Sequence, residues 1–283
     1  MEFRTKVETG KAGFQIGACE EILLVGSCFA GEMRQRFRNN GFPATVNPYG
    51  TMYNPASILH TLERLIDEGR LVSHIVFLTL GTNHVYRLKE TGEIVDNCEK
   101  RPAALFEEEK LTMDECAEYL LKAVELLKAH QPEVQVVMTV SPIRYRKYGY
   151  HESQLSKATL LLAIEKTIRT STTSTVCYFP AYEIVMDELR DYRFYATDML
   201  HPSEQAVDYI WERLVAWCFS NEAIAFMDEW IPIRQALTHR PFNPESEEYL
   251  RFMQQTHERL TAFKKKYPKL STLNSKLSAP TDL

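Results

Sequence analysis

The sequence lacks paired cysteines, long apolar runs and an apolar N-terminal segment. Its six cysteines are spread singly with no C-x-x-C pair, which argues against a disulfide framework and against a zinc site. No apolar run approaches the roughly 18–20 residues that span a bilayer. The first residues, MEFRTKVETG, are polar and show no secretory signal. These absences predict a cytoplasmic protein without a membrane partner.

An excess of basic residues is missing as well. The formal net charge is −5, so the chain carries no electrostatic signature of nucleic-acid binding. The 283 residues are 45% hydrophobic and 25% charged, which is ordinary for a globular protein. We therefore expect one sizeable core and no nucleic-acid partner.

Short apolar runs recur along the chain and predict the strands of one sheet. They are residues 22–25, 44–46, 75–80, 134–140 and 176–179. Their continuous β-branched character is typical of strands that are buried on both faces of a parallel sheet. Helical patterns occupy residues 30–40, 112–127, 156–169 and 203–219. This alternation predicts an α/β fold, a three-layer α/β/α sandwich whose chemistry gathers at the carboxyl ends of the strands.

The character of the chain changes after residue 220, where no strand-like run remains. Asn243 and Pro244 are typical of the N-cap and first position of a helix, and we expect that helix to end at Pro268. The sequence therefore predicts an α/β domain at residues 1–220 and a helical extension with a loose tail at 221–283. We expect the extension to pack on the core or to form a homodimer.

A carboxylate and a histidine stand three positions apart in Asp198-Met199-Leu200-His201. Asp198 can accept the Nδ1–H of the imidazole, which fixes the tautomer and leaves Nε2 free as a base. Such pairs also occur on ordinary surface loops. This pair lies late in an α/β chain, just before a predicted helix, and that place favours a catalytic role.

The segment ILLVGSCFA has the outline of a nucleophile elbow. A buried strand runs into Gly26, and Ser27 and Cys28 follow at the start of a predicted helix. A helix N-terminus favours a thiolate or a developing oxyanion. The alternative is that Ser27 caps the helix and Cys28 is a small buried residue.

Two further turns follow predicted strands. Gly50 could donate its N–H to an oxyanion, and Asn83 could donate from its carboxamide. Either residue is also common in ordinary turns. Together with Ser27 or Cys28, Asp198 and His201, they make a candidate active site at the strand ends.

The strings LLVGSCFA, NPYGTMYNP, GTNHVY, VSPIRYRKYG and ELRDYRFYATDMLHPS occur in this order. They resemble the GSCFA family, which is similar to the SGNH (GDSL-like) hydrolases. The resemblance implies a flavodoxin-like five-stranded parallel sheet of order 2-1-3-4-5. It also implies that Gly50 and Asn83 match the glycine and asparagine of the SGNH pattern, and that Asp198 and His201 match its last block.

The first block departs from that pattern. Without gaps, Ser27 stands where the hydrolases have Asp, and Cys28 stands where they have the nucleophilic Ser. A shift of one residue would restore Ser27 as the nucleophile. The choice between Ser27 and Cys28 stays open in the sequence.

The resemblance implies a hydrolase of ester bonds, an acyl or acetyl esterase. We expect a small-molecule or carbohydrate ester as substrate, with no cofactor and no metal. His84, beside Asn83, and Arg144, after the fourth strand, are candidate substrate-binding residues. The alternatives are an acyltransferase that uses a thioester donor and a non-catalytic module that binds carbohydrate or coenzyme A.

Overall fold

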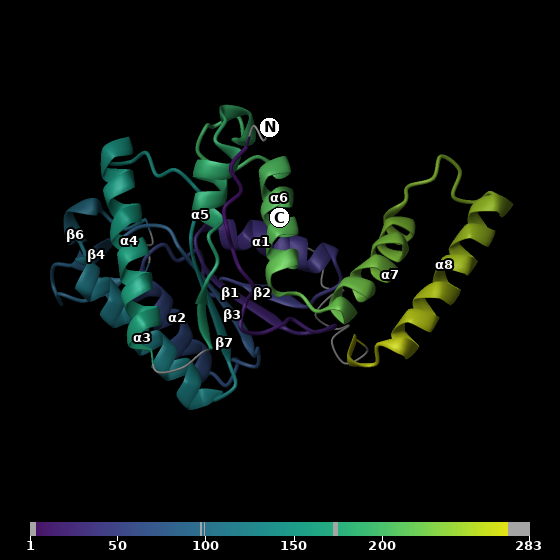
Figure 1. Ribbon diagram of the computed structural model, residues 1–283, viewed down its shortest axis with the longest axis horizontal. Coiled ribbons are helices and arrows are strands. Elements are labelled where there is room, and N and C mark those ends of the chain that lie inside the picture. The colour runs from purple at the N-terminus through teal and green to yellow at the C-terminus, as the bar shows by residue number, and fades with distance from the viewer. Residues whose placement is uncertain (1–3, 97, 99, 172–174, 271–283) are drawn as a thin grey trace.

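The computed structural model describes residues 4–96, 98, 100–171 and 175–270. At its centre is a five-stranded sheet in the order β2-β1-β3-β7-β8 (Figure 1). The strands are β1 (Ile22–Gly26), β2 (Ala44–Val46), β3 (Ile75–Leu80), β7 (Gln135–Val140) and β8 (Val176–Tyr178), and every pairing is parallel. Numbered among themselves, they have the predicted order 2-1-3-4-5, so the predicted fold is confirmed.

Helices cover both faces of this sheet. One face carries α1 (Cys28–Asn39) and α6 (Glu204–Cys218), and the other carries α2 (Pro55–Asp67), α3 (Met113–His130) and α4 (Tyr150–Thr170) (Figure 1). Short helical turns also occur: η1 (Ala103–Leu105), α5 (Ala181–Glu183), η2 (Ile184–Leu189) and η3 (Tyr192–Phe194). The sequence predicted no helix at α2, although Asn54 caps it by accepting the Ser57 N–H.

Successive side chains along each strand point to opposite faces of the sheet and pack into two separate cores. In β1, Ile22 and Leu24 pack among residues of α1 and α6. Leu23 and Val25 point to the opposite face and pack among residues of α2, α3 and α4. Both faces are fully buried, because successive side chains of a strand point to opposite sides of its sheet. This double burial explains why the strands read as continuous apolar runs.

A second sheet was not predicted. It has three antiparallel strands, β4 (His84–Leu88), β5 (Ile94–Val95) and β6 (Phe106–Lys110). Glu107, Glu108 and Glu109 lie in β6. Acidic residues are uncommon in strands, so this segment reads as a loop. Backbone pairing with β4 decides its conformation.

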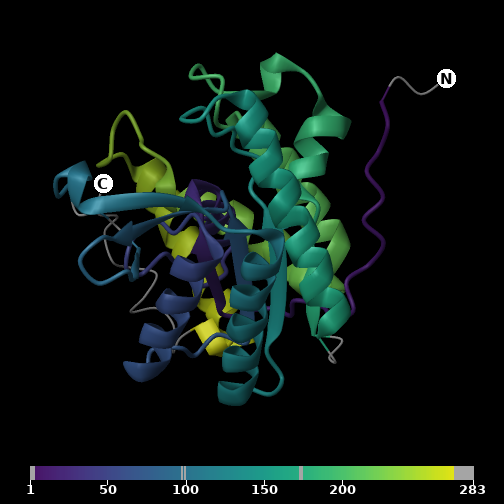
Figure 2. The same ribbon diagram turned by 90° about the vertical axis from the view of Figure 1, so that its left-hand side faces the viewer.

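The N-terminal segment runs extended along the outside of the molecule (Figure 2). Ala12 donates its backbone N–H to the Trp217 carbonyl, and Ile16 donates to the Cys218 carbonyl. Further out, the Val7 N–H donates to the Glu188 carboxylate. The segment is thereby tied to the end of α6 and to η2.

Two helices after the sheet domain form a hairpin that projects to one side (Figure 1). They are α7 (Asn221–Thr238) and α8 (Glu247–Lys266). The base of the hairpin joins the core, because Phe226 packs against Phe42 at 5.3 Å and against Phe263 at 5.2 Å between ring centroids. The predicted boundary near residue 220 stays a prediction. The loose tail was predicted at residues 269–283, of which 271–283 lie outside the described residues.

The predicted start of the last helix is wrong by three residues. Ser246 is the N-cap of α8 and accepts the Tyr249 N–H at 3.3 Å. Asn243 instead organises the turn before it, accepting the Glu245 N–H on its side chain. Helix α4 also begins earlier than predicted, at Tyr150, directly after Gly149 with a φ of +84°. In both helices the local turn decides the start.

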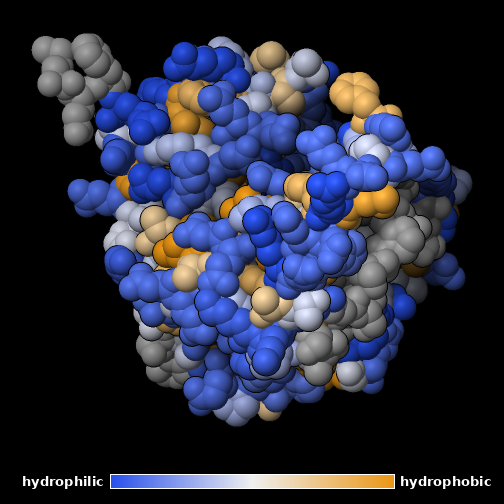
Figure 3. Space-filling model, turned by 90° about the vertical axis from the view of Figure 1, so that its right-hand side faces the viewer, coloured by the Kyte–Doolittle hydropathy of each residue, from blue (hydrophilic) through white to orange (hydrophobic). Residues whose placement is uncertain are grey.

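Apolar atoms on the hairpin side of the molecule are scattered among hydrophilic ones (Figure 3). The homodimer through the C-terminal helices therefore stays a prediction. Among the helices of the described residues, none combines the length and the apolar character that crossing a bilayer would need.

Gly26, the last residue of β1, has no room for a side chain. Its φ is +147°, and a Cβ placed there would lie 2.1 Å from the Thr79 carbonyl oxygen of β3. Gly31, four residues into α1, has nothing within 4 Å of the same position. Only the first glycine is required by close backbone approach.

We expect Gly26→Ala to lower the free energy of unfolding by roughly 2–4 kcal/mol, because the methyl group must push β1 away from β3. The matched control Gly31→Ala should raise stability by about 1 kcal/mol through helix propensity. Urea unfolding followed by circular dichroism measures both. Equal stability of the two variants would contradict the close approach.

Candidate active site

Ser27 occupies the turn between β1 and α1 and is buried. Its backbone N–H donates to the Thr79 carbonyl at 2.9 Å, and its hydroxyl lies 3.3 Å from the Thr79 hydroxyl. Only 2% of the residue is exposed. Although Ser27 is the N-cap of α1, its side chain caps no N–H group. Its hydroxyl therefore contacts Thr79 of β3 and does not cap the helix.

Cys28 is the first residue of α1 and is partly exposed. Its Sγ lies 3.4 Å from the phenol oxygen of Tyr53. Burial, and then the hydrogen bond with Cys28, raise the pKa of Tyr53 above its ordinary value. Tyr53 therefore stays protonated and can donate to a sulfur that carries negative charge. The alternative of Cys28 as a buried packing residue is wrong.

Tyr53 also holds the end of β3 beside this elbow. Its carbonyl accepts the N–H groups of Gly81 at 2.8 Å and Thr82 at 2.9 Å. A Cβ on Gly81 would lie 3.4 Å from the Cβ of Ser27. The ends of β1 and β3 are thus in van der Waals contact at the candidate nucleophile.

Asp198 and His201 form a hydrogen-bonded pair. The Asp198 Oδ2 lies 2.6 Å from Nδ1 of His201, while its Oδ1 accepts the N–H groups of Leu200 at 2.8 Å and His201 at 3.0 Å. These bonds from the His201 backbone and side chain and from Leu200 lower the pKa of Asp198 to about 2. The carboxylate is therefore ionised at neutral pH and can hold the Nδ1–H, which leaves Nε2 of His201 available as a base.

The loop that carries this pair is tied to the loop after β7. The Arg144 N–H donates to the Leu200 carbonyl at 2.9 Å, and its guanidinium donates to the Met199 carbonyl at 3.1 Å. Ala196 donates its N–H to the His201 carbonyl. Among the described residues, no hydrogen bond joins the His201 ring to Ser27 or Cys28. Both the pair and the elbow lie at the carboxyl edge of the sheet, because the loop of the pair is held by Arg144 after β7 and the elbow follows β1.

The two candidate oxyanion donors are already engaged. The Gly50 N–H donates to the Asn47 carbonyl at 2.9 Å in a turn where Gly50 has a φ of +106°. Asn83 is buried and donates from Nδ2 to the Leu111 carbonyl at 2.6 Å. An amide nitrogen carries a second hydrogen, so Asn83 keeps one donor. Both oxyanion roles stay predictions.

His84 is buried beside Asn83 and stacks on Tyr148, with ring centroids 3.9 Å apart. Its Nδ1 lies 3.8 Å from a Glu108 carboxylate oxygen. Burial, followed by the positive charge of Lys110, lowers the pKa of His84. Its predicted contact with substrate stays a prediction.

One polar face of α4 organises the strand ends, and the sequence analysis missed it. The Ser156 hydroxyl accepts the Asn83 N–H at 3.0 Å, and Ser153 accepts the Tyr145 N–H at 3.3 Å. Lys157 donates from Nζ to the Gly81 and Ser141 carbonyls, both at 2.8 Å. The available signal was the position of Ser153, Ser156 and Lys157 on the face that continues as the buried apolar stripe of the helix.

Lys157 bridges the ends of β3 and β7 from a fully buried position. Burial lowers the pKa of its ammonium to about 7. Desolvation disfavours the charged form, and the two carbonyl acceptors compensate only part of that cost.

The sequence matches the GSCFA family over residues 21–74 and 69–214, which is more than half of the chain. The chain belongs to the GSCFA family. Residues 230–278 match the GSCFA domain protein, C-terminal domain, which covers the end of α7 and all of α8. No curated protein matches the chain in sequence.

Several solved structures are similar to this GSCFA protein. A GDSL-like lipase from Bacteroides thetaiotaomicron has 15% identity and a TM-score of 0.45, with 70% of this chain and 86% of that chain covered. A member of the lipolytic protein G-D-S-L family from Veillonella parvula has 13% identity and a TM-score of 0.45, with coverage of 70% and 97%. A carbohydrate esterase family 3 protein from Talaromyces cellulolyticus has 12% identity and a TM-score of 0.42, with coverage of 74% and 99%. The activities named are those of the other proteins.

The buried Lys157 predicts a pH-dependent stability. Its folded pKa of about 7 lies below the ordinary value of 10.5, so the unfolded chain binds more protons between these values. Stability from this group therefore rises with pH. We expect the stability difference between wild type and Lys157→Met to shift by roughly 2 kcal/mol in favour of wild type from about pH 7 to about pH 9.

Urea unfolding at several pH values measures this shift. Lys166→Met is the matched control, because Lys166 lies on the same helix but is exposed and paired with Asp114. The control difference should not change over this pH range. Parallel curves for wild type and Lys157→Met would contradict the assignment.

Proposed function

We propose that the protein is an acyl hydrolase that cleaves esters through Cys28, with Asp198 and His201 as its base. The observation that carries this proposal is the arrangement at the carboxyl edge of the sheet. A partly exposed thiol begins a helix after β1, and a histidine on the same edge has its Nδ1 held by an ionised carboxylate. Both are requirements of nucleophilic acyl chemistry.

Cys28 is preferred to Ser27 as the nucleophile because of their surroundings. Ser27 is buried with its hydroxyl beside that of Thr79, whereas Cys28 is partly exposed and so more accessible to an ester carbonyl. Cys28 begins α1, and the free N–H groups and dipole of a helix N-terminus stabilise negative charge that develops during a reaction. The phenol of Tyr53 gives the sulfur a hydrogen-bond donor.

In the first half of the reaction, Nε2 of His201 takes the proton of the Cys28 thiol as Sγ attacks the ester carbonyl carbon. The C=O electron pair moves onto oxygen and forms a tetrahedral oxyanion. That oxyanion accepts hydrogen bonds from the Cys28 N–H and from the second Nδ2 hydrogen of Asn83. When the C–O bond to the alcohol breaks, the alcohol leaves with the proton held by His201. An acyl thioester remains on Cys28.

In the second half, water attacks the thioester carbonyl while Nε2 of His201 takes its proton. The C–S bond then breaks, and the sulfur recovers that proton as the carboxylic acid leaves. Asp198 stays ionised throughout and stabilises the imidazolium, since its pKa is held at about 2. Gly50 can join the oxyanion site only if its N–H releases the Asn47 carbonyl.

We take an O-acylated carbohydrate as the proposed substrate class, without a cofactor. Acyl transfer is a second candidate, because a thioester on Cys28 can pass its acyl group to an alcohol in place of water. Product analysis separates the two: free acid accumulates in hydrolysis, and a new ester accumulates when an acceptor alcohol is added.

Cys28 should be the site of covalent labelling. With iodoacetamide at neutral pH, we expect mass spectrometry to find alkylation at Cys28 first, and Cys28→Ala should lose at least about a hundredfold in kcat/KM on p-nitrophenyl acetate. Cys98→Ser is the control, because Cys98 is also partly exposed. Full activity of Cys28→Ala would reject the thiol mechanism.

His201→Ala should lose roughly a hundredfold or more in kcat, since general-base catalysis contributes that much. The alkylation of Cys28 should slow as well, because the thiolate loses its base. His151→Ala, which removes an exposed histidine at the start of α4, should leave both rates unchanged. Unaltered kinetics of His201→Ala would reject the Asp198–His201 pair as the base.

A further inference from the structure

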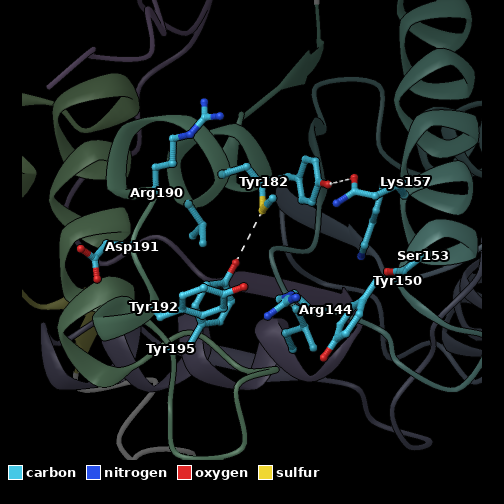
Figure 4. A pocket seen from close by; sticks show the side chains of 13 residues that line it. Arg144, Tyr150, Ser153, Lys157, Tyr182, Arg190, Asp191, Tyr192 and Tyr195 are labelled. Atoms are coloured by element: carbon cyan, nitrogen blue, oxygen red, sulfur yellow. Dashed lines mark hydrogen bonds between the residues drawn. The ribbon is translucent and has the colours of Figure 1, made fainter.

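A cavity of about 240 Å³ is lined by Arg144 and Tyr195 (Figure 4), which contact the loop of Asp198 and His201. Its walls come from the loop after β7, from α4, and from residues 182–195, which include parts of α5, η2 and η3. Ligand pockets for drug-sized molecules usually measure about 300–1,000 Å³. This cavity therefore suits one ring or one small substituent of a larger substrate.

Two residues that line the cavity also contact the loop that carries the candidate base. Arg144 lines the cavity and also holds Leu200 and Met199, which lie between Asp198 and His201. Tyr195 lines it too and forms a β-bridge with Pro202, the residue after His201. A group bound in the cavity would lie against the loop that carries the base.

Tyrosine rings surround the Arg144 guanidinium (Figure 4). Its central carbon lies 4.3 Å from the ring centroid of Tyr150, 5.3 Å from that of Tyr195 and 5.8 Å from that of Tyr192. The rings hold the guanidinium in place without neutralising its charge, and ring faces accept few of its N–H donors. Its backbone acceptor at Met199 uses one donor of five.

Two basic side chains at this cavity, Arg144 and Lys157, have no carboxylate partner among the described residues. Within the part of the chain that the structure describes, neither Arg144 nor Lys157 forms an ion pair with a carboxylate; both donate to backbone carbonyls. Lys157 is 3% exposed and lines the cavity, and its two carbonyl acceptors leave one of its three N–H donors free. The other charged lining residues are paired elsewhere, Arg190 with Asp187 and Asp191 with Arg193.

We propose that this cavity binds a carboxylate or phosphate group of the substrate, so that the enzyme acts on acyl esters of anionic sugars. The inference rests on the proposed acyl hydrolysis and adds its substrate class. The planar guanidinium of Arg144 matches two oxygens of such a group, and the tyrosine rings offer flat faces to a sugar ring. An anion would also stabilise the charged form of Lys157, whose burial is otherwise unfavourable.

Binding tests the cavity independently of catalysis. Isothermal titration would compare methyl glucuronoside, glucose 6-phosphate and methyl glucoside on wild type, Arg144→Gln and Arg146→Gln. We expect at least one charged ligand to bind roughly tenfold more tightly than the neutral one, because hydrogen bonds to charged groups are the stronger ones. Arg144→Gln should remove that preference. The control Arg146→Gln should keep it, since Arg146 is exposed and lies outside the cavity.

Kinetics on the O-acetylated forms of the same three compounds test the substrate class. The ratio of kcat/KM for charged over neutral ester should fall roughly tenfold in Arg144→Gln and stay constant in Arg146→Gln. This ratio cancels any general loss that Arg144→Gln causes by loosening the Asp198–His201 loop. Whichever charged ester has the higher kcat/KM shows whether the cavity prefers a carboxylate or a phosphate group.

Equal binding of charged and neutral ligands, or a preference that survives in Arg144→Gln, would overturn the inference and leave the proposed hydrolysis untouched. Arg144-dependent binding of the charged ligands without turnover of any acetyl ester, p-nitrophenyl acetate included, would support the anion site and count against the proposed function. The two failures are therefore distinguishable.

Discussion

At the point where β1 leaves the sheet, its backbone touches that of β3 with no space for a side chain between them. Gly26 fills this position, and the Thr79 carbonyl lies where a Cβ would stand. The contact turns the chain sharply enough for Cys28 to begin α1. Ser27 then closes the turn through its backbone and hydroxyl bonds to Thr79. The position of the candidate nucleophile therefore depends on this backbone contact.

Side chains of helix α4 position the remaining parts of the candidate site. On α4, Ser156 fixes the Asn83 backbone, and Lys157 joins the ends of β3 and β7 through two carbonyl oxygens. The loop after β7 in turn carries Arg144, which holds the segment between Asp198 and His201. Buried polar groups of this kind are costly when unpaired, so each one constrains its partners strongly. The dyad, the asparagine and the cavity are connected through this network.

Particular residues show where sequence reasoning succeeded and where it failed. The strands of the central sheet were found because both of their faces are buried, which makes the runs continuously apolar. The acidic strand β6 was missed because its pairing with β4 overrides the low strand propensity of glutamate. The start of α8 was displaced because Asn243 suits a turn as well as an N-cap, and only the neighbouring backbone decides between them.

The sequence by itself determined the fold class, the strand order through its family motifs, and the Asp198–His201 pair, because a separation of three residues brings these side chains together locally. It could not choose between Ser27 and Cys28, since that choice depends on which side chain faces Thr79 and which faces outward. It also gave no indication that Lys157 spans two strand ends or that Arg144 and Tyr195 share a cavity. Those contacts join residues far apart in the chain, so only the tertiary structure decided them.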